Sequence, residues 1–252
     1  MQLMLQLPLS EECIQVILGS ILGDGSLTVN RGYANARLSF RHSVTQQEYF
    51  YWKVEKLKEI SSDKCVFRQG SIYKKDGFGE IKLRFQSLAL ESLTYLHKFT
   101  SKRSKKVIKR RWLNLLNPLG LLVWWLDDGS LVSNSREGVF CTDSFSKKEV
   151  DILIKYLKIV WGINTKIGSM RKGKSTYLRI YINSTEELKK FLRLILPHMK
   201  VEQMLPKFLI LYKIPELQER WISEVVNLTT FKREVIEKYL SEKKSRYKRF
   251  RG

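Results

Sequence analysis

The sequence predicts an α+β protein in which one structural unit occurs twice, each time in the order helix, strand, strand, helix, strand, strand, helix. Three observations predict this architecture. The segment 22–27 recurs at 126–131, with five of the six residues identical. After each copy, apolar and polar residues alternate as they do in half-buried strands. Between these segments, apolar residues recur at helical spacing behind a serine that suits a helix start. The 252 residues leave room for two repeats of about 100 residues each.

The first predicted helix covers 11–24 and contains two glycines in its interior. Gly19 and Gly23 are four residues apart, so they share one face of the helix. Glycine destabilises a helix interior by about 1 kcal/mol relative to alanine, so two of them indicate that another backbone packs closely against this face. Pro118 suits the first turn of an equivalent second helix, which runs on to Asp128.

The remaining elements of the first repeat follow in order. The alternating segment 36–41 predicts a strand, and Ser43 is expected to cap the helix after it. A hairpin turn is expected at 74–77, which contains Asp-Gly. The alternating segment 81–85 predicts the next strand, and Ser87 is expected to open the last helix of this repeat.

The second repeat is predicted to contain the same elements. The segment 139–142 predicts a strand, and either Ser144 or Ser146 is expected to cap the following helix. The alternating segment 178–182 predicts a further strand, and Ser184 is expected to open the last helix.

These patterns divide the chain into four parts. They are the first repeat (1–100), a basic linker (101–117), the second repeat (118–207) and a C-terminal extension, helical with a basic tail (208–252). The linker holds seven Lys or Arg residues between Ser101 and Trp112. We expect the linker and the tail to add contacts with phosphates, because clustered cations neutralise a polyanion.

The chain is strongly basic, with 46 Lys and Arg residues against 25 Asp and Glu residues and a formal net charge of +21. Such a charge is typical of proteins that bind nucleic acid or an anionic membrane surface. The longest apolar run, 119–126, is far shorter than the ~20 residues that span a bilayer, so we expect no membrane association. The first ten residues do not form a signal peptide, and the three cysteines lack the spacing of a zinc site or a disulfide framework. We therefore expect a location in the cytoplasm or nucleoid, or in an organelle matrix (mitochondrion or chloroplast), and no secretion.

The glycine-rich first helix and the tryptophan-rich second helix both end in Asp-Gly, at Asp24 and Asp128. We expect the glycine to end each helix with a positive φ. A carboxylate at a helix C-terminus is electrostatically unfavourable, and two of them in a pseudo-twofold arrangement repel each other unless cations intervene. Two carboxylates with about two divalent ions can hold the attacking and leaving oxygens of a phosphodiester. A plain helix-stop turn is the alternative, but its recurrence in a duplicated basic chain favours a metal site.

The alternating strands each present one apolar face and one face of basic, hydroxyl or amide side chains. Such side chains suit contacts with base edges and phosphates in a major groove. The alternative is an ordinary solvated face, but these strands carry no acid on it. Two sheets with strands of about eight residues cover about 16–20 base pairs. The predicted DNA contacts are Arg37, Ser39, Arg41, Lys82, Arg84, Gln86, Tyr177, Arg179 and Tyr181, with Arg68, Lys166 and Arg171 on or beside the neighbouring strands.

The segments 17–25 and 121–129 resemble the two LAGLIDADG motifs of single-chain homing endonucleases, and the resemblance extends over 10–207. It implies two pseudo-symmetric αββαββα repeats with central motif helices and two antiparallel sheets that form a saddle over double-stranded DNA. It also implies a monomer that makes a double-strand break with short 3′ overhangs in a long, asymmetric target by metal-dependent phosphodiester hydrolysis. The implied cofactor is Mg²⁺ or Mn²⁺, with about two or three ions at the interface between the repeats.

The resemblance also assigns site residues. The catalytic, metal-binding carboxylates are those of Asp24 and Asp128, and the backbone carbonyls of Gly23 and Asp127 are further candidate ligands. The side chain of Asp127 stands where the family usually has a small or neutral residue, so it is given no metal role. Lys106 matches the basic residue that acts on the active-site water or the transition state.

The second repeat departs from this pattern near its end. Gln203 or Met204 stands where a lysine is expected, and Lys207 lies further along the chain. We therefore expect one strand of the target to be cut more slowly than the other.

Two other functions remain open. An intron maturase of this fold would bind intron RNA and assist splicing, and a DNA-binding regulator would have no catalysis. Retention of both motif acids favours the nuclease. The absence of splicing motifs around the repeats favours a free-standing or intron-encoded enzyme over an intein. The histidines have no metal-ligand spacing and are expected to be structural or to contact DNA; they are His42, His97 and His198.

Overall fold

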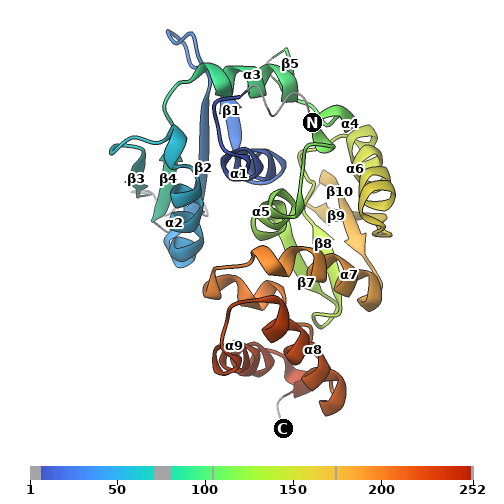
Figure 1. Ribbon diagram of the computed structural model, residues 1–252. Helices are drawn as coiled ribbons and strands as arrows, with labels where there is room; N and C mark the ends of the chain where they lie inside the picture. The colour runs from blue at the N-terminus through green and yellow to red at the C-terminus, as the bar shows by residue number, and fades with distance from the viewer. Residues whose placement is uncertain (1–6, 71–80, 104, 174, 251–252) are drawn as a thin grey trace. The chain divides into compact units, whose positions relative to one another are not determined.

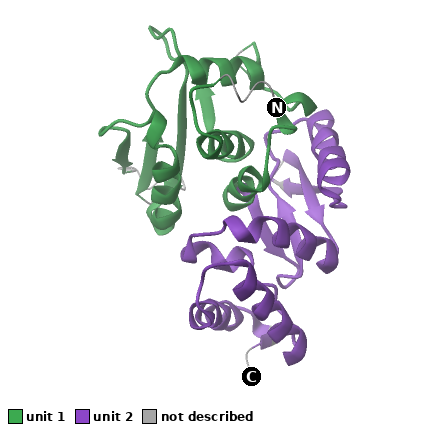
Figure 2. Ribbon diagram, viewed as in Figure 1, with its two compact units in different colours: residues 1–127 green, residues 128–252 purple. Residues whose placement is uncertain are grey.

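The computed structural model describes residues 7–70, 81–103, 105–173 and 175–250. The hairpin turn expected at 74–77 lies outside these residues. The order of helices and antiparallel strands confirms the predicted α+β class. The chain forms two compact units, Met1–Asp127 and Asp128–Gly252 (Figure 2). In the described part of the chain, each helix is too short or too polar to cross a membrane.

The first unit contains a four-stranded antiparallel sheet in the order β1-β2-β4-β3 (Figure 1). Helix α2 contacts β2 and β4, and helix α3 contacts β1 and β2. The helices are α1 (Glu11–Leu22), α2 (Gln47–Lys56), α3 (Glu91–Thr100), α4 (Arg110–Leu113) and α5 (Pro118–Asp128), with short 3-10 helices η2 (Val44–Gln46) and η3 (Lys58–Ile60). The strands are β1 (Ser26–Thr28), β2 (Arg37–Ser43), β3 (Val66–Gln69), β4 (Lys82–Gln86), β5 (Ser101–Lys102) and β6 (Lys105–Lys106).

The sheet of the first unit separates a buried face from a polar face. In β2, Leu38, Phe40 and His42 are buried, while the residues between them are exposed or half-buried. Strand β4 has the same pattern, with Leu83 and Phe85 buried. Burial of each large apolar side chain stabilises the fold by about 1.5–3 kcal/mol, so this alternation fixes which face carries the polar side chains.

Helices α1 and α5 pack closely against each other within the first unit (Figure 1). A Cβ atom placed on Gly19 would lie 2.7 Å from the Cβ of Val123 and closer still to the carbonyl oxygen of Gly120. A Cβ on Gly23 would lie 2.7 Å from an oxygen of Asp127. The close backbone approach expected from the two glycines is therefore confirmed.

A buried glutamine joins α1 by hydrogen bonds to the segment that leads into α5. The Gln15 side chain is fully buried on α1. Its Nε2 donates to the carbonyl of Leu115 at 2.7 Å, and its Oε1 accepts the backbone N–H of Asn117 at 2.8 Å. Both polar ends of a buried amide are thus satisfied, which avoids the cost of an unmade hydrogen bond and fixes the register of the two helices.

The expectation of a positive φ at the motif glycines is wrong. Among the described residues, neither Gly25 nor Gly129 is in the positive-φ region. Gly25 is instead required by close approach, because a Cβ there would lie 2.7 Å from the Cβ of Ser20. Gly129 begins β7 directly at the end of α5.

The second unit contains a four-stranded antiparallel sheet in the order β7-β8-β10-β9. Helix α6 contacts β9 and β10, and helix α7 contacts β8 and β10. The strands are β7 (Gly129–Val132), β8 (Glu137–Phe140), β9 (Lys166–Lys172) and β10 (Ser175–Ile182). The helices are α6 (Lys147–Trp161), α7 (Thr185–Ile195), α8 (Pro215–Leu228) and α9 (Arg233–Ser245), with 3-10 helices η5 (Leu196–His198), η6 (Glu202–Lys207) and η7 (Lys248–Phe250).

Three of the four expected serine caps are present. Ser146 forms a capping box at the start of α6, and Ser184 caps α7. Ser43 caps the short helix η2, which leads into α2. Ser87 does not cap α3, because its hydroxyl oxygen accepts the backbone N–H of Leu38 at 2.9 Å.

Helices α8 and α9 form hydrogen bonds with the end of η6 and with the segment that follows it. The indole N–H of Trp221 donates to the carbonyl of Phe208 at 3.0 Å. The buried Lys243 donates from its Nζ to the carbonyls of Pro206 and Leu209 at 2.7 and 2.8 Å. Burial, with the neighbouring charge of Arg246, lowers the pKa of Lys243 from 10.5 to about 7.

This lysine predicts a specific dependence of stability on pH. Between pH 7 and 10.5 the unfolded chain holds a proton at Lys243 that the folded chain lacks, so stability rises with pH through this window. From pH 7 to 9 we expect the free energy of unfolding to increase by about 2 kcal/mol more in the wild type than in Lys243→Met. Urea denaturation of both proteins at both pH values measures this. If the difference in the free energy of unfolding between wild type and Lys243→Met is the same at pH 7 and pH 9, the prediction is wrong.

Candidate active site

Asp24 follows α1 directly, at the turn into β1, and its side chain is 44% exposed. It lines a polar pocket of about 270 Å³ in the first unit. The other lining residues are Ser26, Ser39, Phe40, Arg41, Lys82 and Arg84. The pocket therefore combines one exposed carboxylate, which suits a hard cation, with three cations that suit phosphate.

Strands β2 and β4 bring the predicted DNA contacts of the first unit together. Arg41 pairs with Arg84 across the two strands, and Ser39 pairs with Gln86. Directly opposite residues in an antiparallel pair share a face, so these side chains lie on the polar face of the sheet. Lys82 lies on the same face, two residues from Arg84 along β4.

Further polar residues share this face. The hydroxyl of Ser26, on β1, lies 3.1 Å from the hydroxyl of Ser39. The predicted contact Arg37 is held with its guanidinium 4.2 Å from the ring centre of Tyr33. Ser26 was not among the predicted site residues, although its place two residues after Asp24 in the repeated segment was a visible signal.

Arg68 and Arg171 lie on the neighbouring strands, as predicted, but not on the polar faces of the sheets. Arg68 of β3 pairs with the buried Leu83, so it lies on the face opposite to Arg84. Arg171 of β9 pairs with Thr176, which alternates with the polar-face residues of β10. Their strands do not alternate cleanly in sequence, so the register could not be read there. On β3, the residue that lies on the polar face is Gln69, not Arg68. Its side-chain oxygen accepts a hydrogen bond from Arg41 at 3.5 Å.

In the second unit, Tyr177, Arg179 and Tyr181 share one face of β10, and Lys166 lies opposite Tyr181. Arg179 donates from Nε and Nη2 to the two carboxylate oxygens of Asp143, each at 2.8 Å. This side-chain hydrogen bonding holds the pKa of Arg179 above its usual value. The guanidinium is thus oriented by protein, with donors left over for a further acceptor.

Lys106 lies at the C-terminal end of α1. Its Nζ donates to the carbonyl of Ile21 at 2.8 Å, three residues before Asp24. It also lines a pocket of about 180 Å³ together with Gly25 and Ser26. The structure thus places this lysine beside the turn that carries Asp24, as an active-site role requires.

Asp128 has its own polar surroundings in the second unit. Its carbonyl accepts the backbone N–H of Cys141 at 2.9 Å. Burial raises the pKa of the Cys141 thiol; the cations Arg179 and Lys207 oppose this shift, and Asp128 adds to it. The charges of Lys207 and Asp128 are therefore both close enough to the Cys141 thiol to affect its pKa.

Among the three candidates for the second basic residue, charge and burial favour Lys207. Met204 is buried in the core. Lys207 is half-buried, and its charge opposes the rise in the pKa of the Cys141 thiol. Gln203 is half-buried and carries no charge. Cys141 is a site neighbour that the sequence did not single out.

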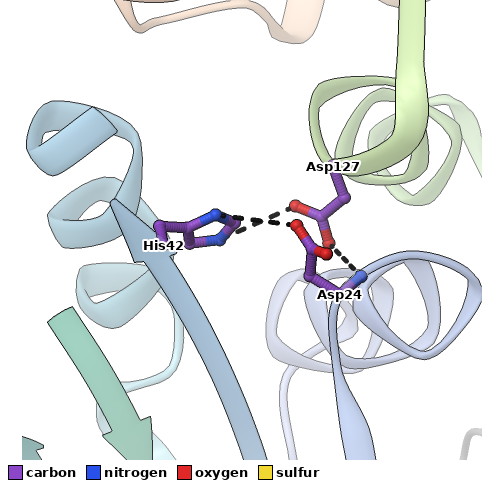
Figure 3. A group of neighbouring side chains, drawn as sticks. All are labelled: Asp24, His42 and Asp127. Atoms are coloured by element: carbon purple, nitrogen blue, oxygen red, sulfur yellow. Dashed lines mark hydrogen bonds and ion pairs between the residues drawn. The ribbon is translucent and has the colours of Figure 1, made fainter. Parts of the chain in front are cut away.

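A second polar cluster joins Asp24 to Asp127 in the first unit (Figure 3). His42 Nδ1 lies 3.7 Å from Asp24 Oδ2, and His42 Nε2 lies 3.8 Å from Asp127 Oδ1. Each of the three residues offers an atom within 4.8 Å of the others, which is the spacing of a metal-binding group. The sequence alone shows no sign of this cluster around His42, which forms because the sheet brings β2 beside the end of α1.

The two carboxylates of this cluster differ in what they offer a cation. The Asp24 carboxylate is partly exposed, whereas the Asp127 side chain is fully buried. The Asp127 oxygens already accept from Tyr49 Oη at 2.7 Å and from Lys53 Nζ at 3.0 and 3.2 Å. The Asp24 carboxylate therefore fits a divalent metal ion, and the Asp127 side chain does not.

Comparison with protein families gives one match. The model of the LAGLIDADG DNA endonuclease family matches residues 14–191 of this chain. Among solved structures, the homing endonuclease I-WcaI bound to its DNA recognition sequence is similar in fold, with a TM-score of 0.67 and 24% sequence identity. That match covers 82% of this chain and 88% of the other.

Curated relatives are similar over most of this chain. Protein RecA of Mycobacterium gastri is 29% identical over 220 residues, which are 79% of this chain and 48% of that protein. Cytochrome b mRNA maturase bI2 of Saccharomyces cerevisiae is 28% identical over 185 residues, 69% of this chain and 42% of that protein. The chain thus spans about half the length of the RecA relatives that it matches.

Proposed function

The chain belongs to the LAGLIDADG DNA endonuclease family, and on this premise we propose that it is a site-specific homing endonuclease that acts on double-stranded DNA. The observation that carries the proposal is the pocket of the first unit, in which the exposed Asp24 lies among Arg41, Lys82 and Arg84. A scissile phosphate needs both kinds of group, a carboxylate for metal and cations for its own charge. The product is a double-strand break with short 3′ overhangs in a long, asymmetric target.

In this proposal each group has a separate task. Asp24 and Asp128 would hold Mg²⁺ or Mn²⁺, about two or three ions in all, which when bound would supply Lewis-acid activation of the phosphodiester and of water. The backbone carbonyls of Gly23 and Asp127 would be further ligands. Lys106 orients the attacking water and stabilises charge on the phosphate as it reacts.

The strand faces hold the duplex in register. In the first unit, Arg41, Arg84 and Lys82 neutralise phosphates, while Ser39 and Gln86 reach base edges. In the second unit, Tyr177, Arg179 and Tyr181 do the same, with Lys166 beside them. Because the two faces differ in sequence, the target is asymmetric. The protein acts as a monomer in a compartment that holds its DNA, either a nucleoid or an organelle matrix.

The two halves are expected to cut at different rates. Lys207 is the basic residue of the second half, but it lies at a different place in the repeat from Lys106. Separate labelling of the two DNA strands, with single-turnover kinetics, measures both rates. Equal rates would remove this part of the proposal.

The polar-face assignment predicts a contrast between arginines of one sheet. We expect Arg84→Ala to weaken target binding by about 1–3 kcal/mol and to make its dependence on salt less steep. Arg68→Ala, on the opposite face of the same sheet, is the matched control and should leave affinity nearly unchanged. Binding titrations at several salt concentrations measure both. Equal losses in the two variants would contradict the assignment.

The cleavage function can be tested on a DNA pool that contains every possible target. The purified chain is incubated with Mg²⁺ and randomised duplex DNA, and the newly formed ends are sequenced. Recovery of one long consensus with paired 3′ overhangs is the expected result. No cleavage above that of an Asp24→Asn, Asp128→Asn double variant would reject the nuclease.

An RNA-binding maturase is the second candidate function, favoured by the similarity to cytochrome b mRNA maturase bI2. A basic surface of strands can also contact the phosphates of structured RNA. Addition of the chain to self-splicing intron transcripts tests this candidate. Faster splicing that persists in Asp24→Asn would establish an RNA function separate from cleavage.

A further inference from the structure

The buried carboxylate of Asp127 is the starting point, since it has no matching acid in the first motif. The equivalent residue is Gly23, one position before Asp24. The Asp127 side chain is fully buried, and α5 lies there directly against Gly23 at the end of α1. A buried carboxylate is unfavourable unless it is paired and hydrogen-bonded, so its partners explain its presence.

Lys53 is the charged partner. Its side chain is fully buried on α2, with Nζ 3.0 Å from Asp127 Oδ2. The ammonium also lies 4.2 Å from the ring centre of Phe40 and 5.4 Å from that of Tyr49. The Lys53 side chain is thus held between a carboxylate and two aromatic faces, which are contacts that suit an ammonium group.

The positions equivalent to Asp127 and Lys53 in the repeated sequence do not hold an acid and a lysine. Gly25 and Gly129 are equivalent in the repeated segment, and the sheet registers then make Phe40 equivalent to Phe140. Continuing this alignment along the chain places Leu153 where the first unit has Lys53. Leu153 is also fully buried. Asp127 and Lys53 therefore occur as a matched acid and base, whereas the positions equivalent to them hold Gly23 and Leu153.

The Asp127 carboxylate also contacts the turn that carries Asp24. Its Oδ2 accepts the backbone N–H of Asp24 at 3.2 Å (Figure 3). This N–H lies one residue beyond the C-cap of α1, where the chain has left the helix.

We propose that Asp127 is a positioning residue for Asp24, held in its buried place by Lys53, and that its side chain is not a metal ligand. The Asp127 carboxylate fixes the Asp24 peptide through the Asp24 N–H. The Lys53 ammonium occupies the position beside Asp127 that a metal ion would otherwise take. Tyr49 completes the set by donating to Asp127 Oδ1. The inference rests on the proposed function only in treating Asp24 as the catalytic acid.

Two double variants test this proposal. The variant Lys53→Leu with Asp127→Ala removes both charges of the buried ion pair. It also removes the acceptor of the Asp24 N–H. In Lys53→Met with Asp127→Asn, charge is also removed but an amide oxygen remains as acceptor. Either single variant leaves an uncompensated buried charge and is expected to fold poorly, so the double variants carry the test.

The first readout is hydrogen exchange at the Asp24 amide, which needs neither metal nor DNA. We expect faster exchange in the Leu/Ala variant and near wild-type protection in the Met/Asn variant. Lys56→Leu is the matched control, because Lys56 lies on the same helix and forms a more exposed ion pair with Glu12 of α1. Its Asp24 amide should exchange as in the wild type.

The second readout is cleavage. We expect the Leu/Ala variant to lose about 10- to 100-fold in kcat with DNA affinity unchanged, and the Met/Asn variant to recover most of the rate. A purely structural role would reduce both double variants alike or change affinity as well. Unchanged amide exchange in the Leu/Ala variant, or no recovery in Met/Asn, would overturn the proposal. If the wild type does not cut DNA, the proposed function fails while the exchange measurement still decides the role of Asp127.

Discussion

Asp24→Asn and Asp128→Asn are each expected to abolish double-strand cleavage, with rate losses of at least about 10³-fold. Asparagine keeps the shape of aspartate and one carbonyl oxygen, but it has no negative charge to hold a divalent ion. The loss therefore measures the charge rather than the fold. Single-turnover cleavage of a target carrying different labels on its two strands gives the rates separately, including any remaining nick.

DNA binding supplies the internal control for this result. The Asp24 carboxylate lines the same pocket as Arg41, Lys82 and Arg84, where it faces the phosphate that these cations would bind. Removing its charge in metal-free buffer should leave affinity unchanged or increase it, because like-charge repulsion is relieved. Asp151→Asn is the matched control, since Asp151 is a surface partner of Lys147 on α6 and should cut at the wild-type rate. Cleavage by Asp24→Asn at the wild-type rate would show that this carboxylate is not a metal ligand.

The order of the elements could be predicted because each has a clear period. The buried Leu38 and Phe40 alternate with polar residues in β2, and the apolar residues of α7 recur at helical spacing. Burial of one face leaves a single stable register for such segments. The same reasoning placed Ser39 and Arg84 correctly on the polar face.

The edge strands could not be predicted in the same way. Arg68 stands in a strand whose last three residues are all exposed, so the sequence carries no mark of which side faces the core. Hydrogen bonding to the neighbouring strand determines the face, and that pairing is not visible in one strand.

The cluster around Asp127 was missed for a different reason. Its members come from β2, α2 and α5, and Lys53 lies 74 residues before Asp127 in the chain. One signal was present, because Lys53 stands between the buried Tyr49 and Leu57 on the apolar face of a helix. A lysine at such a position requires a buried anion, but only the tertiary structure shows which one.

Gly19→Ala is expected to destabilise the protein, although helix propensity alone predicts the opposite. In a free helix, replacing glycine by alanine stabilises by about 1 kcal/mol. Here the added Cβ would lie 2.7 Å from the Cβ of Val123 and closer to the Gly120 carbonyl, which belongs to the backbone of α5 and cannot rotate away. We expect the steric term to win, with a net loss of about 2–3 kcal/mol in the free energy of unfolding. Chemical denaturation of wild type and variant measures the sign as well as the size.

Gly70→Ala is the matched control for this prediction. Among the described residues, no atom lies within 4 Å of a Cβ placed on Gly70, and its φ is not positive, so alanine should be neutral or slightly stabilising there. The site also links stability to activity, because α1 and α5 lead directly to Asp24 and Asp128. A Gly19→Ala protein that remains folded at low temperature should therefore lose cleavage activity, since small displacements of catalytic groups are costly in rate. A Gly19→Ala variant as stable as Gly70→Ala would mean that the two helices have room to separate, and the close packing assigned to α1 and α5 would be wrong.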